Sequence, residues 1–463
     1  MRTYEVLVLG GGSAGTAAAA AAQAAGRQVA LFNRGELGGL CILRGCMPTK
    51  TMLHAAHLAH GAAHHHTPGI GHAIPSIDFA RVMENKRDKV QRFQKAKIES
   101  VEATGYEVID AYARFDGPDT VLATFPDQST ETYRFTHGAV LATGSDPIMP
   151  PIDGIEDVPV WSSDDVMNLT EAPSSAIVLG SGAIGLELAV FLARMGTRTV
   201  LASRRRVFSK IDSLLSDEME CILKEEPNLH LVSPFEATRI ELVEDLVHFR
   251  IQTATGPETL VAPHFLAATG RRARLEGMGL EAAHVQFENG EVRHDECMRT
   301  SNDRIFVAGD ATGSAQLLHV ANWEGKAAGL GAAGVHGEHP VERRLAMSVI
   351  FTDPPLASVG MTESEAKAAG ISVETASAKF AQTGRAITLD VQHGVWKLVV
   401  RKDDGEILGS QILGPRADDI AHVISTAMYY RGTVHDLLKM PWYHPTVTEV
   451  LLSLARELAV KTA

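Results

Sequence analysis

Apolar and polar positions follow the same order twice along the chain: an apolar run, a glycine turn, a helical stretch and a second apolar run. In the first case YEVLVLGGGSAG at 4–15 ends in Gly10-x-Gly12-x-x-Gly15, and QVALFN follows at 28–33. This pattern predicts a strand, a helix and a parallel strand. The first two glycines permit a tight turn beside a pyrophosphate, and the third lets the helix pack on the strand.

The second copy lies at 174–203, where an apolar run leads into Gly180-x-Gly182-x-x-Gly185 and then into another helix and strand. In each copy, the N–H groups at the helix N-terminus would face the phosphates. The alternative, two incidental glycine turns, leaves the complete strand-helix-strand context unexplained. The sequence therefore predicts two dinucleotide-binding folds and two bound dinucleotides.

Other segments predict parts that surround these folds. A charged amphipathic helix is expected at 79–100, and short strands at 106–142 form an insert inside the first fold. AVLATGS at 139–145 and FLAATGR at 265–271 are matching strand endings that mark chain crossings between domains. Three residues at these endings are candidate cofactor contacts: Thr143, Gly144 and Gly270. From about residue 340, strands followed by two helices predict a separate α+β domain.

Composition narrows the class of protein. The chain has 463 residues, of which 45% are apolar and 41 are glycine, as expected for an α/β enzyme of several domains. A net charge of −13 argues against a nucleic-acid partner, which needs a basic face. No uncharged apolar run reaches the length of a membrane span, and the alanine-rich stretch at 16–26 lacks the basic leader of a signal peptide. We therefore expect a cytoplasmic protein with no membrane partner.

The segment GGLCILRGCMPTK at 38–50 holds Cys41 and Cys46, two of only four cysteines. In such a chain, a close pair is more often catalytic or metal-binding than a staple. The two sulfurs can meet across one turn if both lie on the first turns of a helix, whose N-terminus favours the thiolate. The alternatives are a zinc site, which lacks two nearby ligands, and a structural bridge. We predict a redox pair.

Together, the glycine turns, the cysteine segment and Gly309-Asp310 resemble the FAD-dependent pyridine nucleotide-disulfide oxidoreductases, which include dihydrolipoyl dehydrogenase, glutathione reductase and mercuric reductase. The resemblance runs from residue 3 to about 455, and its most specific parts are GGxCxxxGCxPTK and HPTxxE. It implies an α/β fold with two Rossmann-like dinucleotide-binding domains and a C-terminal α+β dimerisation domain. The implied FAD-binding domain has two parts, at 1–147 and 271–339. The implied NAD(P)H-binding domain lies between them at 148–270, and the implied dimerisation domain covers 340–463.

The resemblance also implies roles around the cysteine pair. Cys46 would lie next to the flavin as a charge-transfer thiolate, and Cys41 would be the interchange thiol that attacks the substrate. Lys50 would lie under the flavin N5 and pair with Glu187, where its positive charge stabilises the anionic reduced flavin. A surface lysine is the alternative at this position.

The motif HPTVTE carries His444 and Glu449. By resemblance, they form an acid–base dyad that reaches into the active site of the partner subunit, which implies a homodimer. A surface ion pair is the alternative. Asp310 would bind the ribityl chain of FAD, although an aspartate there also suits a helix N-cap. His319 lies in LLHVANWEG, which is similar to the LAHxAxxEG of dihydrolipoyl dehydrogenases.

Four positions depart from the family pattern. Asn33 ends the second strand where an acidic residue usually binds the adenosine ribose, and it can still accept one hydrogen bond. Leu40 replaces a threonine, and Ala183 replaces the tyrosine that gates the nicotinamide pocket in some reductases. Ser203 stands where NAD recognition wants a carboxylate.

Arg204 and Arg205 follow Ser203 and suit a 2′-phosphate, so NADPH is favoured over NADH. The alternative is a solvated charge run. NADPH use would conflict with a housekeeping dihydrolipoyl dehydrogenase, which uses NAD⁺.

Six histidines lie between residues 54 and 66, and His54, His57 and His60 could share a helix face. Imidazoles at this spacing can bind a metal. Without acidic or thiol companions, they are more often solvated or pocket-lining, so we expect no metal. Mercuric reductase is disfavoured because the chain ends ARELAVKTA, without that enzyme's C-terminal cysteine pair.

The predicted function is transfer of electrons from NAD(P)H through FAD and the Cys41–Cys46 disulfide to a small-molecule disulfide. One alternative is dihydrolipoyl dehydrogenase activity, in which the enzyme oxidises the dithiol dihydrolipoamide with NAD⁺. Another is a flavin-binding partner protein with vestigial redox residues.

Overall fold

The computed structural model of the protein describes residues 1–65, 67–335, 337 and 339–462. The chain forms two compact units, each assembled from three stretches. The first unit comprises Met1–Pro48, Glu84–Ile148 and Arg271–Ala346. The second unit comprises Thr49–Met83, Met149–Gly270 and Met347–Ala463.

The first unit contains a sheet in the order β3-β2-β1-β6-β5-β4, with β19 paired to β6. Strands β1, β2, β3, β6 and β19 pair in parallel, whereas β4 and β5 form an antiparallel insert. The parallel strands are apolar because both of their faces are buried. The strands are β1 (Arg2–Leu9), β2 (Val29–Phe32), β3 (Glu107–Ile109), β4 (Tyr112–Phe115), β5 (Thr120–Thr124), β6 (Thr130–Leu141) and β19 (Ile305–Val307).

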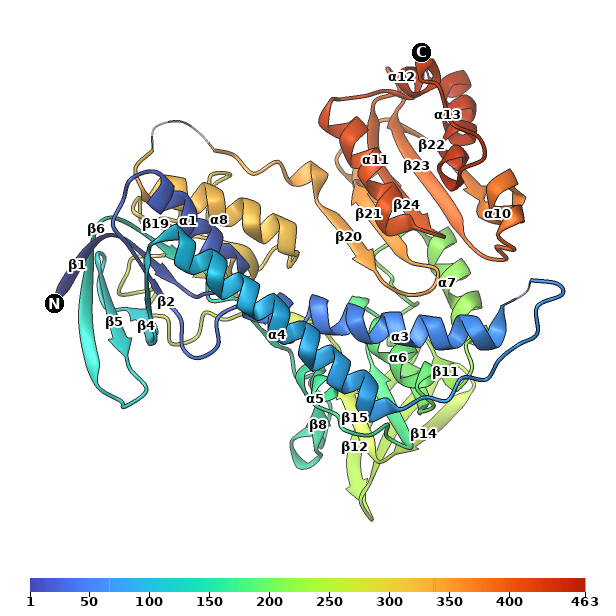
Figure 1. The fold of residues 1–463 in the computed structure, drawn as a ribbon, viewed down its shortest axis with the longest axis horizontal. Helices are drawn as coiled ribbons and strands as arrows, with labels where there is room; N and C mark the ends of the chain where they lie inside the picture. The colour runs from blue at the N-terminus through green and yellow to red at the C-terminus, as the bar shows by residue number, and fades with distance from the viewer. Residues whose placement is uncertain (66, 336, 338, 463) are drawn as a thin grey trace. The chain divides into compact units, whose positions relative to one another are not determined.

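Helices α1 (Ser13–Ala24) and α8 (Leu318–Ala332) lie side by side against this sheet (Figure 1). A Cβ atom at Gly325 would lie 2.2 Å from the carbonyl oxygen of Ala14, and one at Gly329 would lie 2.2 Å from that of Ala18. The small residues of both helices therefore permit direct backbone packing. The first unit also contains several small elements: β7 (Ser145–Pro147), β16 (Arg271–Ala273), β17 (Phe287–Glu288), β18 (Glu291–Val292), η2 (Gly309–Thr312) and η3 (Arg343–Leu345).

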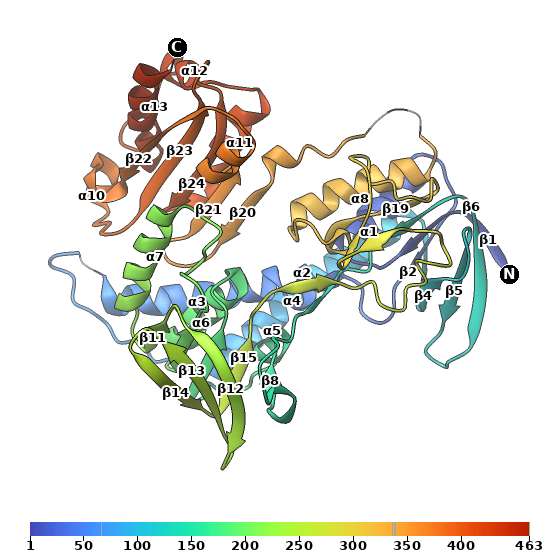
Figure 2. The same cartoon turned by 180° about the vertical axis from the view of Figure 1, so that it is seen from behind.

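The second unit contains a parallel sheet in the order β11-β10-β9-β15-β8 and an antiparallel sheet β12-β13-β14 (Figure 2). Helix α6 (Ala183–Arg194) is buried along most of its length and packs on β9 and β10. The remaining elements are η1 (Ile155–Asp157), β8 (Val160–Trp161), α5 (Ser163–Met167), β9 (Ser175–Leu179), β10 (Arg198–Ala202), α7 (Ser213–Glu225), β11 (Leu229–Val232), β12 (Glu236–Val243), β13 (Leu246–Thr253), β14 (Gly256–Ala262) and β15 (His264–Ala267).

The C-terminal part of the second unit is an antiparallel sheet in the order β20-β21-β24-β23-β22, covered by helices (Figure 2). Three helices follow β24 where two were expected, because Thr433 and Asp436 form a capping box that starts an extra short helix. The elements are β20 (Met347–Ile350), β21 (Leu356–Gly360), α9 (Glu363–Ala368), β22 (Val373–Lys379), η4 (Phe380–Gln382), α10 (Gly384–Thr388), β23 (Val395–Arg401), β24 (Ile407–Leu413), α11 (Ala417–Tyr429), α12 (Val434–Lys439), η5 (Val447–Glu449) and α13 (Val450–Lys461).

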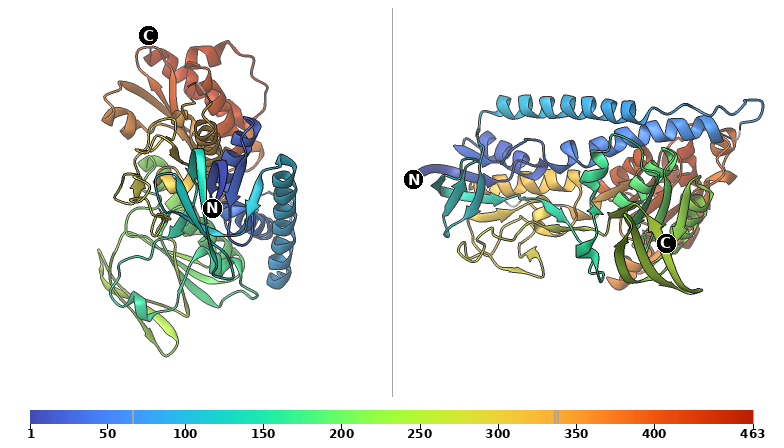
Figure 3. Two further views of the ribbon diagram at one scale, coloured as in Figure 1. Left: turned by 90° about the vertical axis from the view of Figure 1, so that its left-hand side faces the viewer. Right: turned by 90° about the horizontal axis from the view of Figure 1, so that it is seen from below.

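Three helices complete the chain: α2 (Gly39–Leu43), α3 (Cys46–His64) and α4 (Phe79–Thr104). Helix α4 runs as one continuous helix four residues beyond its predicted end (Figure 3). Two dinucleotide-binding folds followed by an α+β part confirm the predicted fold class. In the described part of the chain, no helix has both the length and the apolar character needed to span a bilayer.

Candidate active site

The first glycine turn has no room for side chains. Gly10 has a φ of +114°, and a Cβ there would lie 2.2 Å from the carbonyl oxygen of Ala142. A Cβ at Gly15 would lie 1.8 Å from the carbonyl oxygen of Gly10, so α1 packs directly on its own turn. Gly12 caps α1 without a side-chain hydrogen bond, which leaves the backbone N–H groups of the first turn for a ligand.

A second glycine segment lies against this turn. A Cβ at Gly39 would lie 2.6 Å from the Cα atom of Gly12. The two backbones therefore meet without side chains, beside a helix N-terminus that favours anions. This bare cradle fits the pyrophosphate of a dinucleotide such as FAD.

Asn33 directly follows β2 and lies beside the same turn. A Cβ at Gly11 would lie 2.5 Å from the Oδ1 atom of Asn33, so glycine leaves the room that this side chain occupies. The Nδ2 atom of Asn33 donates to the carbonyl oxygen of Gly35 at 3.0 Å. The amide thus keeps an oxygen next to the turn, where an acceptor for a ribose hydroxyl is needed.

Asp310 is held by residues from two other parts of the first unit. The hydroxyl of Ser145 donates to Oδ2 of Asp310 at 2.5 Å and accepts from Nε of Arg271 at 2.8 Å. Nearby, Thr143 Oγ1 donates to the carbonyl oxygen of Arg274 at 2.7 Å, whose own N–H donates to Gly144 at 2.9 Å. The segment 271–274 therefore contacts both the Thr143-Gly144 crossing and the Ser145 hydroxyl that binds the Asp310 carboxylate.

Glu324 is a buried carboxyl that sequence reasoning missed. Its side chain is fully buried, and it accepts from the N–H of Gly309 at 2.9 Å and from Arg343 at 2.8 Å. Burial raises the pKa of Glu324 to about 6, and the guanidinium of Arg343 opposes this rise. Glu324 thus holds the Gly309 turn that presents Asp310. His319, at the second position of α8, is exposed.

The second glycine turn repeats the first. Gly180 has a φ of +116°, and a Cβ there would lie 2.3 Å from the carbonyl oxygen of Ala268. A Cβ at Gly185 would lie 1.8 Å from the carbonyl oxygen of Gly180. Gly182 caps α6 without a side-chain hydrogen bond, and Gly270, with a φ of +123°, is exposed. This turn also fits a dinucleotide phosphate.

Ser203, directly after β10, is buried. Its hydroxyl lies 2.7 Å from the hydroxyl of Ser181, which accepts from the N–H of Phe208 at 3.2 Å. Arg204 and Arg205 are exposed, whereas Arg206 pairs with Asp217. Two arginines therefore present their charges just after β10, and Ser203 serves the local structure.

The two cysteines lie on separate helices, which differs from the expected placement on the first turns of one helix. Cys41 lies in α2, and Cys46 is the first residue of α3. Pro48 explains the break, because in a continuous helix its ring would clash with the carbonyl group of Arg44. A Cβ at Gly45 would lie 3.4 Å from the Cα atom of Cys41, so glycine lets the chain return closely over the first cysteine. Both cysteines are half-buried.

Lys50 and Glu187 are brought together although 137 residues separate them. The Nζ atom of Lys50 donates to both carboxylate oxygens of Glu187, at 2.8 and 3.0 Å. The side chain of Glu187 is 4% exposed, whereas that of Lys50 is 30% exposed. The ammonium group also lies 4.7 Å from the ring centroid of Phe351. The structure thus orients the lysine through its carboxylate and keeps it partly accessible.

His444 and Glu449 also meet. Nδ1 of His444 lies 3.1 Å from Oε1 of Glu449, and the other carboxylate oxygen accepts from the N–H of Thr446 at 2.8 Å. This backbone hydrogen bond, followed by His444, lowers the pKa of Glu449. The side chain of His444 is 74% exposed, so its other ring nitrogen is accessible to a proton-transfer partner.

The histidine run separates along α3. His54 is exposed, whereas His57 and His60 are half-buried, and His66 lies outside the described residues. Among the residues that the structure describes, no group of three histidine, cysteine or acidic side chains is arranged to hold a metal ion. His57 instead contacts Arg194, a partner that sequence reasoning did not single out.

Two family models match the chain. Residues 4–325 match the model described as pyridine nucleotide-disulphide oxidoreductase, and residues 346–455 match the dimerisation domain of the same family. The family binds FAD and a pyridine nucleotide. The matched dimerisation domain supports a homodimer.

Similar proteins include a dihydrolipoyl dehydrogenase of Geobacillus stearothermophilus, 34% identical over 99% of this chain and 96% of that protein. A mercuric reductase of Streptomyces lividans is also 34% identical, over 99% of this chain and 96% of its own length. A solved structure of the HOCl-induced flavoprotein disulfide reductase RclA from Escherichia coli has the same fold, with a TM-score of 0.83 and 24% identity over 98% of this chain and 99% of that chain.

Proposed function

Since the chain belongs to the pyridine nucleotide-disulphide oxidoreductase family, we propose that it moves electrons from NADPH, through FAD and the Cys41–Cys46 pair, to a small-molecule disulfide. The observation that carries the proposal is the arrangement along α3. This helix begins at Cys46 and, one turn later, carries Lys50 bonded to the buried Glu187. A thiol at a helix N-terminus and a fixed cation on the same helix suit a dithiol relay.

The chain's own groups account for the exchange. The thiolate of Cys41 attacks one sulfur of the substrate disulfide, forms a mixed disulfide and releases the first thiol. Cys46 then attacks the sulfur of Cys41, releases the second thiol and closes the Cys41–Cys46 disulfide. FAD, when bound, supplies the two electrons from the nicotinamide that return this disulfide to the dithiol. Overall, one NADPH, one proton and one disulfide give NADP⁺ and two thiols.

Protons on the substrate side are assigned to His444 and Glu449 of the partner subunit. Each leaving thiolate needs a proton, and His444 has an exposed ring whose Nδ1 faces Glu449. The carboxylate holds the ring orientation and stabilises the charged imidazolium.

The residues that hold FAD are proposed to be those of the first unit. The glycine cradle of Gly10, Gly12, Gly15 and Gly39 fits the pyrophosphate, and Asp310, fixed by Ser145, would accept from the ribityl chain. Asn33 would accept from the adenosine ribose, and Thr143, Gly144 and His319 remain proposed contacts.

The proposed nicotinamide site lies in the second unit. Gly180, Gly182 and Gly185 would hold the pyrophosphate, and Gly270 remains a proposed contact. The preference for NADPH is supported by the exposed Arg204 and Arg205, which can pair with a 2′-phosphate. Ser203 supplies no carboxylate for a ribose hydroxyl, which NADH recognition would use.

Anaerobic titration of the purified holoenzyme with NADPH and with NADH tests the relay. Wild-type protein is expected to develop a long-wavelength absorbance band, because a Cys46 thiolate would lie beside the flavin. Cys41→Ser should keep a band, and Cys46→Ser should lose it. Bleaching of the flavin without this band in wild-type protein, together with unaltered turnover in Cys41→Ser, would contradict the proposal and favour a flavin-binding protein with vestigial cysteines.

Steady-state assays that compare the reduction rates of lipoamide and glutathione disulfide, each with NADPH and with NADH, would identify the substrate. A second candidate, oxidation of dihydrolipoamide with NAD⁺, is favoured by the similar dihydrolipoyl dehydrogenases. Faster turnover of dihydrolipoamide with NAD⁺ than of any disulfide with NADPH would establish this reverse direction. In either direction the cofactors and the substrate, not the surrounding compartment, supply and remove the electrons of the Cys41–Cys46 pair.

A further inference from the structure

Helices α3 and α6 are joined by two polar contacts with the same spacing. Lys50 on α3 binds Glu187 on α6, and His57 on α3 binds Arg194 on α6. In each helix, the two residues are seven positions apart, or about two turns, so they lie on one face. The two contacts therefore form successive rungs between the same pair of helices.

The backbone of Phe351 connects the rungs. Its N–H donates to Oε1 of Glu187 at 3.0 Å, and its carbonyl oxygen lies 3.1 Å from Nε2 of His57. The ring of the same residue lies beside the Lys50 ammonium group. One residue, directly after β20, thus receives polar contacts from both rungs.

The neighbours of His57 define where its proton lies. Arg194 donates from Nη1 to Nδ1 at 2.7 Å, and arginine has no acceptor. Nδ1 must therefore be the acceptor, and Nε2 carries the hydrogen that is donated to the Phe351 carbonyl group. Burial, and then the charge of Arg194, lowers the pKa of His57, which keeps the ring neutral.

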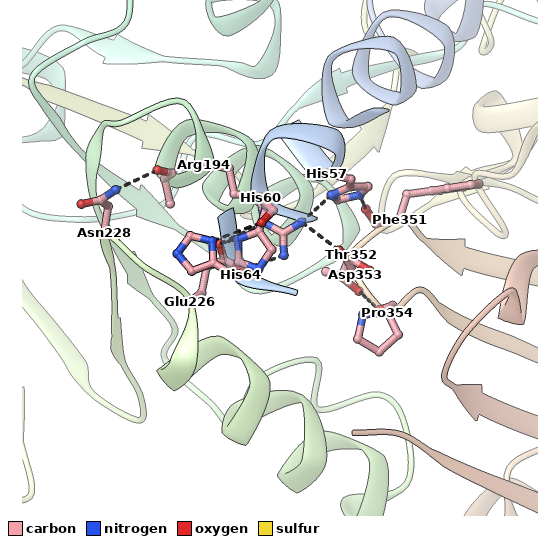
Figure 4. A network of polar contacts seen from close by, with 11 residues as sticks. His57, His60, His64, Arg194, Glu226, Asn228, Phe351, Thr352, Asp353 and Pro354 are labelled. Carbon is pink, nitrogen blue, oxygen red and sulfur yellow. Dashed lines mark hydrogen bonds and ion pairs between the residues drawn. The ribbon is translucent and has the colours of Figure 1, made fainter. Parts of the chain in front are cut away.

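Arg194 is itself held from three sides (Figure 4). Its guanidinium donates to both carboxylate oxygens of Glu226 at 2.8 and 2.9 Å and to Oδ2 of Asp353 at 3.0 Å. The side chains of Arg194 and Glu226 are 3% and 5% exposed. His60 lies 3.4 Å from Glu226 on the same side. The guanidinium group that binds His57 is therefore fixed by several hydrogen bonds and almost fully buried.

We propose that His57 is a positioning residue for the Lys50–Glu187 pair. Braced by Arg194, it fixes the carbonyl group of Phe351, and the N–H of that residue then holds Glu187 in the orientation that receives Lys50. His57 thereby controls where the lysine charge lies. The effect of that charge on the flavin rests on the proposed function, whereas the chain of hydrogen bonds does not.

Three substitutions separate the parts of this chain. His57→Leu removes both hydrogen bonds of the ring. His57→Asn keeps an amide near Nδ1 that can reach Arg194 but is too short for the Phe351 carbonyl group. His57→Gln places an N–H group near Nε2 and is expected to restore the contact. His393→Leu is the matched control, because it removes a histidine that lies 2.9 Å from Glu225, outside the two rungs.

Two measurements on the holoenzyme report the result. Hydrogen exchange at the Phe351 amide, read by mass spectrometry over residues 347–354, should be about fivefold to tenfold faster in His57→Leu and His57→Asn. The flavin midpoint potential should become more negative in the same two variants, because a loosened Lys50 stabilises the reduced anion less well. His57→Gln and His393→Leu should match wild type in both measurements.

Lys50→Met separates this inference from the proposed function. If Lys50→Met shifts the potential and His57→Leu and His57→Asn do not, the positioning role is overturned while the proposed function survives. If Lys50→Met leaves the potential unchanged, the proposed place of Lys50 beside the flavin is overturned, and with it the effect of His57. Unchanged exchange at Phe351 in both His57→Leu and His57→Asn would overturn the hydrogen-bond chain itself.

Discussion

The turn that begins at Gly10 and the turn that begins at Gly180 have matching backbones, with φ angles of +114° and +116°. In both, a Cβ on the third glycine would lie 1.8 Å from the carbonyl oxygen of the first. Both helices start at a glycine N-cap that makes no side-chain hydrogen bond. The sterics of helix-on-strand packing therefore impose one solution in two folds of different sequence.

The turns differ in the pair of residues formed by the middle position of the turn and the position after the second strand. In the first turn Gly11 leaves room for Asn33, whereas in the second the hydroxyl of Ser181 binds that of Ser203. Within each fold, these two residues are thus matched in size: the small Gly11 lies beside the larger Asn33, and Ser181 lies beside Ser203. The comparison leads us to expect that the glycines accommodate either dinucleotide, while the matched pair and its neighbours select between them.

Loss of the third glycine should have the largest effect. Gly15→Ala and Gly185→Ala should each destabilise their fold by about 3 kcal/mol, because the added methyl group meets a carbonyl oxygen. Gly15→Ala should be purified without FAD, whereas Gly185→Ala should retain FAD and lose NADPH binding. Urea denaturation, the flavin absorbance and nucleotide titration measure these outcomes.

Gly61→Ala is the control for both variants, because a Cβ at this helical position meets nothing within 4 Å. It should leave stability equal or slightly higher, since alanine favours a helix. Full FAD content in Gly15→Ala would show that steric closure does not define the first cradle.

The next largest effect should come from the charges that distinguish the second turn. Combined replacement of Arg204 and Arg205 by alanine should weaken NADPH binding by at least about a hundredfold, since two charge-assisted hydrogen bonds are worth about 1.5–3 kcal/mol each. NADH binding should change little. Arg198→Ala, at the other end of β10, is the matched control, and equal losses for both nucleotides would contradict a 2′-phosphate role.

The pH dependence of stability should have opposite signs in the two units. The raised pKa of Glu324, about 6 against an ordinary 4.5, means that the folded state holds its proton longer. Stability should therefore fall by about 2 kcal/mol in total as the pH rises from below 4.5 to above 6. Glu324→Gln should remove this fall, as measured by urea denaturation across that range.

His60 provides the opposite case. Burial, and then Arg194, lowers its pKa from 6.5 to about 4. The unfolded chain binds the proton first on acidification, so stability should fall as the pH drops from 6.5 to 4. His60→Gln should reduce this acid loss. An unchanged slope in this variant would show that the ring does not titrate in the folded state as described.

The smallest effect should come from exchanging the matched pair. Ser181→Gly combined with Ser203→Asp gives the second turn the room of the first and adds a carboxylate for a ribose hydroxyl. The NADH-to-NADPH preference should rise by about tenfold. Ser203→Asp alone should fold less well, because the buried Ser181 hydroxyl leaves no room for the larger side chain.

Local rules predicted both turns, because glycine conformation and strand periodicity depend on adjacent residues. They also located Asn33 and Ser203, the residues that directly follow the second strand of each fold, which the structure places beside the turns. The pairing of Lys50 with Glu187 came from the family resemblance, since 137 residues separate the two. The site roles and the NADPH preference stay predictions.

Residues that act through distant partners were missed. Ser145 reaches Asp310 across 165 positions, and Arg194 reaches His57 across 137. No local pattern marks such contacts, because they form only when separate helices and strands pack. The break between α2 and α3 was readable in principle, since Pro48 forbids a continuous helix through Arg44.

That break divides the proposed redox pair between two helices of unequal length. Cys46 belongs to a 19-residue helix that also carries Lys50 and His57, whereas Cys41 belongs to a five-residue helix that is capped by Gly38 and begins at Gly39, both with positive φ angles. We expect a change in the distance between the sulfurs to displace mainly the short helix α2. The oxidation state of the enzyme is therefore best reported by a spectroscopic probe next to Leu43, while a probe on α3 should remain silent.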